Sequence, residues 1–226
     1  EQGEFNAASI RFSPNNRFLS YEISIAPAGQ GYYEDQLYVL NLQTGESKFV
    51  SSSAVFGHIV PAWSPSSRYI AAGKWNRDHT SSLEVYSVES DRLQSIRIHP
   101  HQLVSLAWSP SKDTLAYSAN TNGQSNGRLY VVNIETGSTY TASQDGRIFD
   151  FGWSPDARYI AYFQAFPGEK TRIYTVDIKQ RCYQELDDIG SNTGTEIKWS
   201  PSSRYLLYRA RNAANTLEYY ATQFDG

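Results

Sequence analysis

The sequence predicts an all-β protein built as a five-bladed β-propeller of four-stranded antiparallel blades, with the last blade incomplete. An aromatic-Ser-Pro tripeptide recurs five times, starting at Phe12, Trp63, Trp108, Trp153 and Trp199. The intervals of 51, 45, 45 and 46 residues match the length of a propeller blade. The 226 residues are 40% hydrophobic and include 17 Tyr, 10 Phe and 5 Trp, a composition that favours strands. A fragment of a larger propeller is the alternative.

The third repeat shows how each unit divides into strands. An apolar run at 104–108 stops before Pro110, and three further strand-like runs follow at 114–118, 128–134 and 138–142. Proline has no N–H for a strand ladder, so the first strand is expected to end there. Turn residues separate the other runs. Four antiparallel strands in about 45 residues make one blade.

The remaining repeats follow the same order, which predicts a single β-propeller domain over 1–226. Its expected repeats are 7–57, 58–102, 103–147, 148–194 and 195–226. The first repeat carries a loop insertion at 24–35, and the fifth stops after a third strand at 216–222. The chain has no Met and begins with Glu1, so we interpret it as a processed or excised segment.

The aromatic residue before each Ser-Pro is expected to pack between neighbouring blades. The five structural repeat positions are therefore Phe12, Trp63, Trp108, Trp153 and Trp199. The Arg four residues after the Ser, as in Arg17 and Arg158, is expected to serve the turn or a bridge to the next blade.

The segments WSPDARYIAY at 153–162, IYTVDI at 173–178 and LYVLNLQTG at 37–45 resemble the repeats of TolB-like propellers. The resemblance covers all five units and implies a propeller fold. Such repeats are found in periplasmic envelope proteins, in propellers of serine peptidases and in sensor domains of membrane-bound regulators. The glycine of the family's turn is replaced by Asn16, Ser67, Asp113, Ala157 and Ser203, so these turns are expected to use another geometry. The residue pairs of true WD repeats are absent from the sequence.

Charge and composition exclude several classes of partner. The net charge is −3 and no segment gathers basic residues, which argues against nucleic acid as a partner. Apolar runs are too short to cross a bilayer, so we expect no direct membrane insertion by this segment. The single Cys182 forms no internal disulfide. No cofactor is expected.

Recognition is predicted on the face that carries the long, variable loops between the second and third strands and between blades. The aromatic candidates for partner binding are Tyr32, Tyr33, Phe56, Trp75 and Phe166. The four histidines map to the same loops: His58, His79, His99 and His101. Their spacing matches no specific metal motif, so we predict no metal site.

Catalysis is not expected, because the sequence has no nucleophile elbow, Walker loop or His-Glu-x-x-His motif. Asp150 and Glu196 occupy matching positions on inner strands, where five-bladed glycosidases place carboxylates. Ion pairing with Arg11 or Lys198 is the favoured explanation for both.

We therefore expect a non-catalytic recognition or scaffold domain that mediates protein–protein interaction. The resemblance implies a place in the bacterial cell envelope, in the periplasm or another extracytoplasmic compartment, with the cytoplasm as the alternative. Other possibilities are the regulatory propeller of a serine peptidase, the sensory domain of a membrane-anchored regulator and, last, a glycoside hydrolase.

Overall fold

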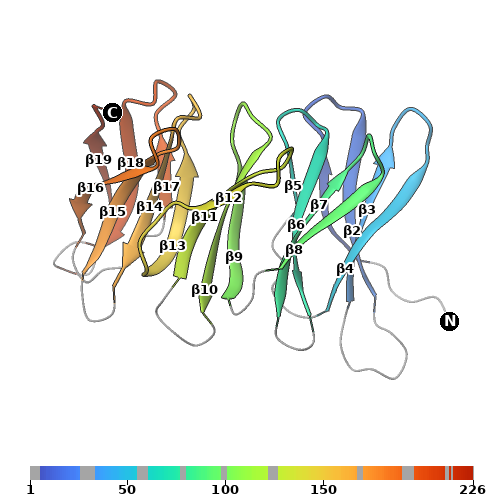
Figure 1. Cartoon of the computed structure of the whole chain (residues 1–226), viewed down its shortest axis with the longest axis horizontal. Helices are drawn as coiled ribbons and strands as arrows, with labels where there is room; N and C mark the ends of the chain where they lie inside the picture. The colour runs from blue at the N-terminus through green and yellow to red at the C-terminus, as the bar shows by residue number, and fades with distance from the viewer. Residues whose placement is uncertain are drawn as a thin grey trace. The chain divides into compact units, whose positions relative to one another are not determined.

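The computed structural model describes residues 6–25, 34–54, 61–76, 80–97, 101–121, 127–166, 170–189, 196–211, 214 and 216–225. These residues form five antiparallel sheets, four with four strands and the last with three (Figure 1). The predicted all-β propeller architecture with an incomplete last blade is confirmed. We call the sheets blades 1 to 5 in chain order.

Each blade is a meander in which consecutive strands pair. Blade 1 contains β1 (Asn6–Phe12), β2 (Phe18–Ile25), β3 (Glu34–Asn41) and β4 (Ser47–Ala54). Blade 2 contains β5 (Ala62–Trp63), β6 (Tyr69–Trp75), β7 (Ser81–Ser87) and β8 (Arg92–Arg97). Blade 3 contains β9 (His101–Trp108), β10 (Thr114–Thr121), β11 (Gly127–Asn133) and β12 (Thr139–Thr141).

The last two blades follow the same order. Blade 4 contains β13 (Arg147–Trp153), β14 (Tyr159–Ala165), β15 (Thr171–Asp177) and β16 (Cys182–Asp188). Blade 5 contains β17 (Glu196–Trp199), β18 (Tyr205–Arg211) and β19 (Leu217–Gln223). Many strands extend one to three residues beyond the ends predicted from the sequence. For example, β10 continues past 118 to Thr121, because polar residues that were predicted as loop still pair with the neighbouring strand.

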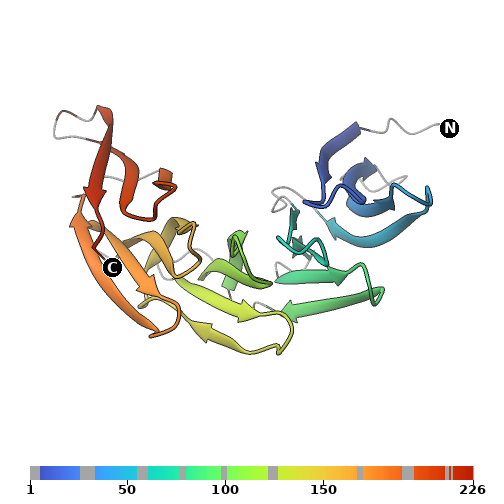
Figure 2. The ribbon, with the colours of Figure 1, turned by 90° about the horizontal axis from the view of Figure 1, so that it is seen from above.

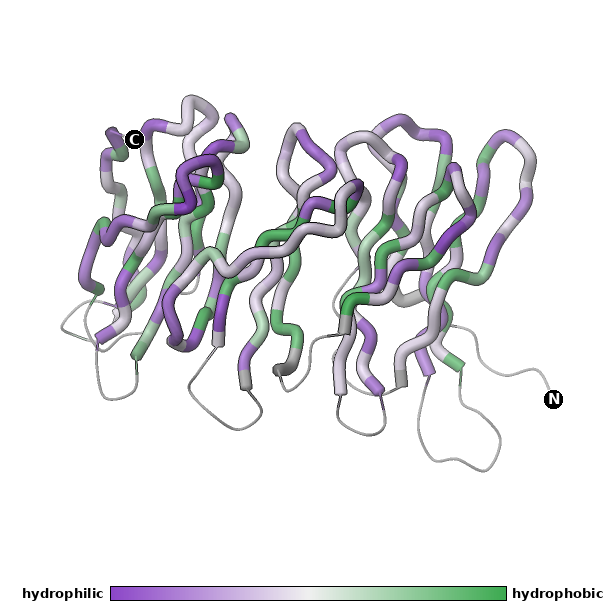
Figure 3. Tube along the Cα trace, in the orientation of Figure 1, coloured by the Kyte–Doolittle hydropathy of each residue, from purple (hydrophilic) through white to green (hydrophobic). Residues whose placement is uncertain are grey.

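The chain divides into two compact units, Glu1–Leu106 and Ala107–Gly226, and each has its own core. In the first unit, Leu37 and Val39 of blade 1 pack with Ile70 and Tyr86 of blade 2. Apolar residues concentrate in the strands and polar residues in the turns (Figure 3). The sheets therefore supply the apolar faces that hold each unit together.

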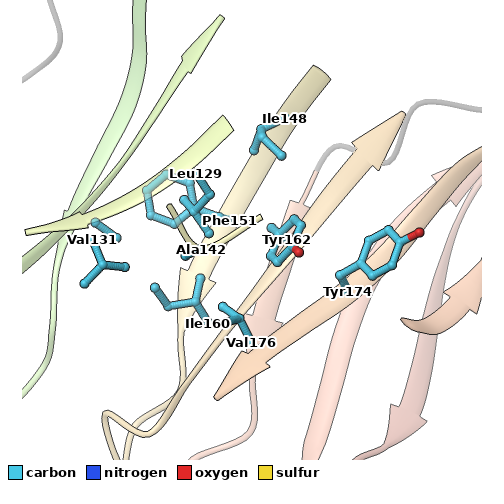
Figure 4. Packing of buried hydrophobic residues seen from close by; sticks show 10 residues of the cluster. Leu129, Val131, Ala142, Ile148, Phe151, Ile160, Tyr162, Tyr174 and Val176 are labelled. Atoms are coloured by element: carbon cyan, nitrogen blue, oxygen red, sulfur yellow. The ribbon is translucent and has the colours of Figure 1, made fainter. Parts of the chain in front are cut away.

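Blade 4 is buried on both faces in the second unit. Side chains alternate along a strand, so Ile160 and Tyr162 face blade 3, whereas Ala161 and Phe163 face blade 5. Figure 4 shows the first interface, where side chains of blades 3 and 4 point toward one another. The sheets of this unit lie side by side when the chain is seen from above (Figure 2).

The Ser-Pro turn is closed by hydrogen bonds on both of its sides. The Ser13 N–H donates to the Phe18 carbonyl oxygen at 2.9 Å, and the Phe18 N–H donates to Ser13 Oγ at 3.0 Å. The same pair of bonds recurs at Ser64 with Tyr69 and at Ser154 with Tyr159. The motif therefore recurs because its serine binds both backbone groups of the residue that starts the next strand.

The expectation that these turns use another geometry is wrong for four of them. Asn16, Ser67, Ala157 and Ser203 have φ between 57° and 62°, the left-handed conformation that glycine normally supplies. This conformation costs about 1–2 kcal/mol for a residue with a Cβ, and the turn's hydrogen bonds offset that cost. In the third repeat the aligned residue is Lys112, not Asp113.

The third turn differs from the others in its bonding as well. Lys112 is not among the described residues with positive φ. The Oγ of Ser109 is buried and has no hydrogen-bond partner in the described part of the chain. The backbone bond from the Ser109 N–H to the Thr114 carbonyl oxygen, at 2.8 Å, closes this turn without a bond to the serine side chain in the described part of the chain.

Three of the motif tryptophans, Trp63, Trp153 and Trp199, connect consecutive blades. Trp63 Nε1 donates to the Arg11 carbonyl oxygen at 3.3 Å and to Ser20 Oγ at 3.1 Å. Trp153 Nε1 donates to the Ala107 carbonyl at 3.0 Å, and Trp199 Nε1 to the Gly152 carbonyl at 3.0 Å. Each carbonyl acceptor belongs to the residue immediately before the aromatic residue of the previous motif. Phe12, which has no N–H on its ring, is 62% exposed in blade 1.

The arginine after the turn pairs within its own blade. Arg158 lies 3.1 Å from Asp177, and Arg68 lies 3.2 Å from Glu89. Asp177 is the last residue of β15, and Glu89 lies in the turn that follows β7. This ion pair therefore joins the two turns at the same end of one blade.

Replacing Trp153 with Phe should lower the free energy of unfolding by about 0.5–1.5 kcal/mol, because the ring stays apolar but the bond to the Ala107 carbonyl is lost. Urea unfolding measures the change. Trp75→Phe is the matched control, since Trp75 Nε1 is buried without a hydrogen-bond partner in the described part of the chain. Equal losses in both variants would contradict a contribution from the interblade bond.

Candidate functional site

The structure describes only some of the predicted binding residues. Tyr32, Tyr33, Phe56, His58, His79 and His99 lie outside the described residues. The assignment of His101 to a loop is wrong, because β9 begins at this residue. The backbone pairing of β9 with β10 extends the strand beyond its apolar run. Trp75 and Phe166 lie within the described part of the chain.

Trp75 is the last residue of β6 rather than part of a loop. Its backbone N–H donates to Ser53 Oγ of β4 at 3.0 Å, and its ring is half-buried. Nearby, Glu84 accepts a hydrogen bond from Ser51 of β4 and lies 3.5 Å from Lys74 Nζ. Trp75 therefore sits in a polar contact between blades 1 and 2.

Phe166 directly follows β14 and lines a groove on the loop-bearing end of blade 4. The groove has a volume of about 470 Å³, and we call it the blade 4 groove. Its lining residues come from the crossover before blade 4, from the end of β14 and from β15 and β16: Gln144, Phe166, Arg172, Tyr174, Tyr183 and Glu185.

Three aromatic rings form the apolar wall of the blade 4 groove. The Phe166 and Tyr174 ring centroids are 6.5 Å apart with the rings at 85°, and those of Tyr174 and Tyr183 are 6.3 Å apart at 83°. Edge-to-face packing of this kind holds the rings in fixed orientations. Tyr183 is 46% exposed, so part of this wall is open to a binding partner.

A charge pair lies beside these rings. Arg172 Nε is 3.7 Å from Glu185 Oε1, and the Tyr174 hydroxyl donates to Glu185 Oε2 at 3.4 Å. The buried Gln164 side chain donates to the Gln144 carbonyl at 2.8 Å and fixes the crossover. The groove thus combines aromatic rings with an arginine and a carboxylate acceptor. Aromatic and arginine residues are enriched in the hot spots of protein interfaces.

A stacked tyrosine pair supports this groove and recurs in blades 1, 3 and 5. Tyr162 and Tyr174 stack with centroids 5.6 Å apart. The equivalent pairs are Tyr21 with Tyr38, Tyr117 with Tyr130, and Tyr208 with Tyr220, at 5.3, 5.0 and 5.5 Å. Blade 2 has Ala72 opposite Glu84 instead.

Sequence reasoning missed these pairs although a signal was present. The first tyrosine stands nine residues after the motif aromatic in four repeats, at 21, 117, 162 and 208. Burial raises the pKa of Tyr117 to about 12, and burial likewise raises the pKa of Tyr162 and Tyr208. These phenols therefore stay protonated at neutral pH.

The inner-strand carboxylates are engaged within the protein. Asp150 accepts hydrogen bonds from the Phe151 N–H at 2.9 Å and from the Ile197 N–H of blade 5 at 3.2 Å. Glu196 forms an ion pair of 2.6 Å with Lys198, which confirms the ion pairing predicted from the sequence for this residue. Asp150 instead uses backbone amides to join β13 to β17.

The residues with described positions contain no group of three or more His, Cys, Asp or Glu side chains that could hold a metal ion. No helix long and apolar enough to span a membrane occurs among them.

Tyr162→Phe should raise the free energy of unfolding by about 1 kcal/mol, because the Tyr162 hydroxyl is buried without a hydrogen-bond partner in the described part of the chain. Tyr208→Phe should instead lower it by about 1–2 kcal/mol, because the Tyr208 hydroxyl donates to Asp187. Thermal or urea unfolding of both variants checks the difference. A loss of stability in Tyr162→Phe would show that its hydroxyl has a partner.

Asp150 should make the protein less stable as the pH rises above 3.8, its ordinary pKa. Burial raises the pKa of this carboxyl in the fold. Between the two pKa values the folded state binds more protons than the unfolded state, so stability falls with rising pH. The stability of Asp150→Asn relative to the parent protein should therefore increase from about pH 4 to about pH 7. Urea unfolding across this range that gives a constant difference would contradict the assignment.

Comparison of the sequence with protein-family models identifies a family to which most of the chain matches. The model of the family described as eukaryotic translation initiation factor eIF2A matches residues 22–172, which is 151 of the 226 residues. No curated protein matches the chain.

Solved structures with the same fold include three propellers of different contexts. A putative TolB from Agrobacterium tumefaciens has 18% identity and a TM-score of 0.57, covering 99% of this chain and 78% of its own. The propeller domain of the Trilobed protease from Pyrococcus furiosus has 14% identity and a TM-score of 0.69, covering 100% and 70%. The acylaminoacyl peptidase of Pyrococcus horikoshii has 13% identity and a TM-score of 0.64, covering 96% and 38%. At these identities the likeness establishes the fold, which is that of TolB-like propellers.

Proposed function

The chain belongs to the family described as eukaryotic translation initiation factor eIF2A, and from this premise we propose that it is a non-catalytic propeller that recognises a protein partner. The proposal is supported chiefly by the blade 4 groove, where Phe166 and Tyr183 stand beside Arg172 and Glu185. Aromatic and arginine side chains in a preformed hollow are the residues that contribute most to protein binding.

The charges at the groove favour a protein over a nucleic acid as the partner. Arg172 is paired with Glu185, so the groove offers no net positive charge to a phosphate backbone. A partner would instead place an apolar side chain against the three rings and bind the charge pair with polar groups. The rigid sheets beneath keep the groove in shape before binding, which reduces the entropy cost of association.

The place of action in the cell is part of the proposal. The likeness to TolB propellers supports an extracytoplasmic location, in the cell envelope. The family description, which names a translation initiation factor, supports the cytoplasmic alternative. Fractionation of the source cells, followed by immunodetection of the native protein, separates these two locations.

Affinity capture with the purified chain from an extract of the source cells tests the function. Replacing Phe166 and Tyr183 together with Ala should reduce recovery of the specific partner at least about tenfold, which corresponds to 1.4 kcal/mol. The matched control replaces Phe49 and Tyr205, which are 55% and 51% exposed away from the groove, and should leave recovery unchanged. Quantitative mass spectrometry provides the readout.

A third variant tests the loops that the sequence predicts, by replacing Tyr32, Tyr33 and Trp75 with Ala. If this variant alone failed to recover the partner, the recognition function would stand. Its site would then lie at these residues rather than in the blade 4 groove. Absence of any specific partner for the parent chain would contradict the proposed function.

The regulatory propeller of a serine peptidase is the second candidate. It is supported by the fold shared with the Trilobed protease propeller and with acylaminoacyl peptidase, of whose length the chain spans 38%. Reading the source gene downstream of Gly226 tests this candidate, since it requires a Gly-x-Ser-x-Gly nucleophile elbow in a hydrolase domain.

A further inference from the structure

An exposed tyrosine ring and a carboxylate stand side by side in the blade 4 groove. Tyr183 and Glu185 are two residues apart on β16, so their side chains lie on the same face of the sheet. The Glu185 side chain is 46% exposed, whereas the side chain of Arg172, its partner in the groove, is 31% exposed. The groove therefore presents an aromatic ring and the acidic member of its charge pair to solvent.

Glu185 retains the capacity to bind another donor. Its carboxylate oxygens lie 3.7 Å from Arg172 Nε and 3.4 Å from the Tyr174 hydroxyl. Both contacts are longer than the roughly 2.7–2.9 Å of a strong charge-assisted hydrogen bond. A carboxylate has about four lone-pair sites. A second cation can therefore reach this carboxylate without displacing a short ion pair.

Elsewhere the chain holds its own arginines with the same two groups, a tyrosine ring and a carboxylate. Two such sites are formed by an arginine, the tyrosine that follows it and an acidic residue at or after the end of the third strand: Arg68 with Tyr69 and Glu89, and Arg158 with Tyr159 and Asp177. The guanidinium carbon lies 5.3 and 4.8 Å from the ring centroid, and the ion pairs span 3.2 and 3.1 Å. Across the described residues no arginine or lysine lies over the ring of Tyr183.

We propose that the blade 4 groove binds an arginine side chain of the partner protein. The inference rests on the function proposed above and names the residue that anchors the partner. The guanidinium would lie against the exposed part of the Tyr183 ring and donate to Glu185, as the chain's own arginines do at the other two sites. The methylene groups of the arginine would contact the rings of Phe166 and Tyr174.

Arginine matches this groove better than other side chains do. Its apolar stem covers the aromatic wall, and its planar guanidinium both stacks on a ring and donates several hydrogen bonds. Lysine carries a point charge that does not stack in this way. An acidic side chain would meet Glu185, which has the same charge, and a wholly apolar one would cover that carboxylate without pairing it. The net charge of −3 on the chain also favours a basic partner.

Arg172 provides a test of the sign of the bound charge. Arg172 and an incoming arginine compete for Glu185 and repel each other. Removing the charge of Arg172 should therefore strengthen the binding of a cation. A groove that recognised an anion would respond in the opposite way, because Arg172 would then be the group that binds it.

The test titrates the whole chain with N-acetyl-arginine N-methylamide and follows the ring signals of Tyr174 and Tyr183 by nuclear magnetic resonance. The shifts should saturate with a Kd of about 10 mM, since one cation–π contact and one exposed ion pair each contribute little. The citrulline analogue, which has the same shape without the charge, should bind at least about fivefold more weakly. The lysine analogue should also bind more weakly, and the aspartate analogue should leave both signals unchanged.

Variants of the groove locate the probe. Glu185→Gln and Tyr183→Leu should each weaken arginine binding at least about threefold, whereas Arg172→Gln should strengthen it about twofold. The matched controls are Glu46→Gln, whose side chain is 64% exposed in the parent chain, and Tyr205→Leu, whose residue is 51% exposed. Both controls should leave the Kd unchanged. The backbone amide spectrum of each variant shows that it is folded.

Equal binding of the arginine and citrulline analogues would overturn the inference, because the groove would then not recognise a positive charge. Binding of the aspartate analogue that is lost in Arg172→Gln would overturn it as well, since the groove would then be an anion site. Failure of every analogue to shift the Tyr174 and Tyr183 signals would also contradict it.

Affinity capture separates these results from a failure of the proposed function. A partner whose recovery depends on Phe166 and Tyr183, but is unchanged in Glu185→Gln and in excess arginine probe, would leave the function standing and overturn the arginine anchor. Arginine binding in a chain that captures no specific protein would confirm the arginine site and contradict its use by a protein partner. Recovery reduced at least about fivefold by Glu185→Gln and by the arginine probe, but not by the citrulline analogue, is the result that the proposal predicts.

Discussion

The contact on which the packing of consecutive blades depends is the indole N–H that reaches from one blade to a backbone carbonyl of the preceding one. A sheet of three or four strands has two faces, and burial of both requires a neighbour on each side. Burial alone does not fix how neighbouring sheets are aligned, because apolar contacts have no direction. The bonds from Trp153 to Ala107 and from Trp199 to Gly152 supply that direction within the second unit.

The Ser-Pro turns and the tyrosine pairs determine which end of each blade carries the variable side chains. The turn places a short, hydrogen-bonded corner at one end of each blade, which leaves sequence variation to the opposite end. There, Tyr174 belongs both to a stacked pair that is part of the core and to the aromatic wall of the blade 4 groove. The groove is therefore shaped by the same residues that hold blades 3 and 4 together, which explains why its aromatic wall is rigid.

The fold was predictable from sequence because each repeat contains the same aromatic-Ser-Pro motif and the same order of strands and turns. The site was predictable only in part. The strand order followed from Pro110 and its equivalents, and Phe166 was singled out as a loop aromatic. The loop assignments of Trp75 and His101 were wrong because backbone pairing extends strands into polar segments. Tyr183 and Arg172 were missed because alternation along a strand does not reveal which face lines a groove. The turn geometry was misjudged because bonds to Ser13 and its equivalents hold a left-handed residue without glycine.

The most direct test of the interblade contact is the exchange of indole N–H protons with solvent, followed by nuclear magnetic resonance for each tryptophan. Slow exchange of the Trp63, Trp153 and Trp199 indole protons, at rates close to those of the most protected backbone amides, is the result that these hydrogen bonds predict. Exchange as fast as that of a free indole at Trp153 and Trp199, in a chain that remains folded, would show that the blades are aligned by something else.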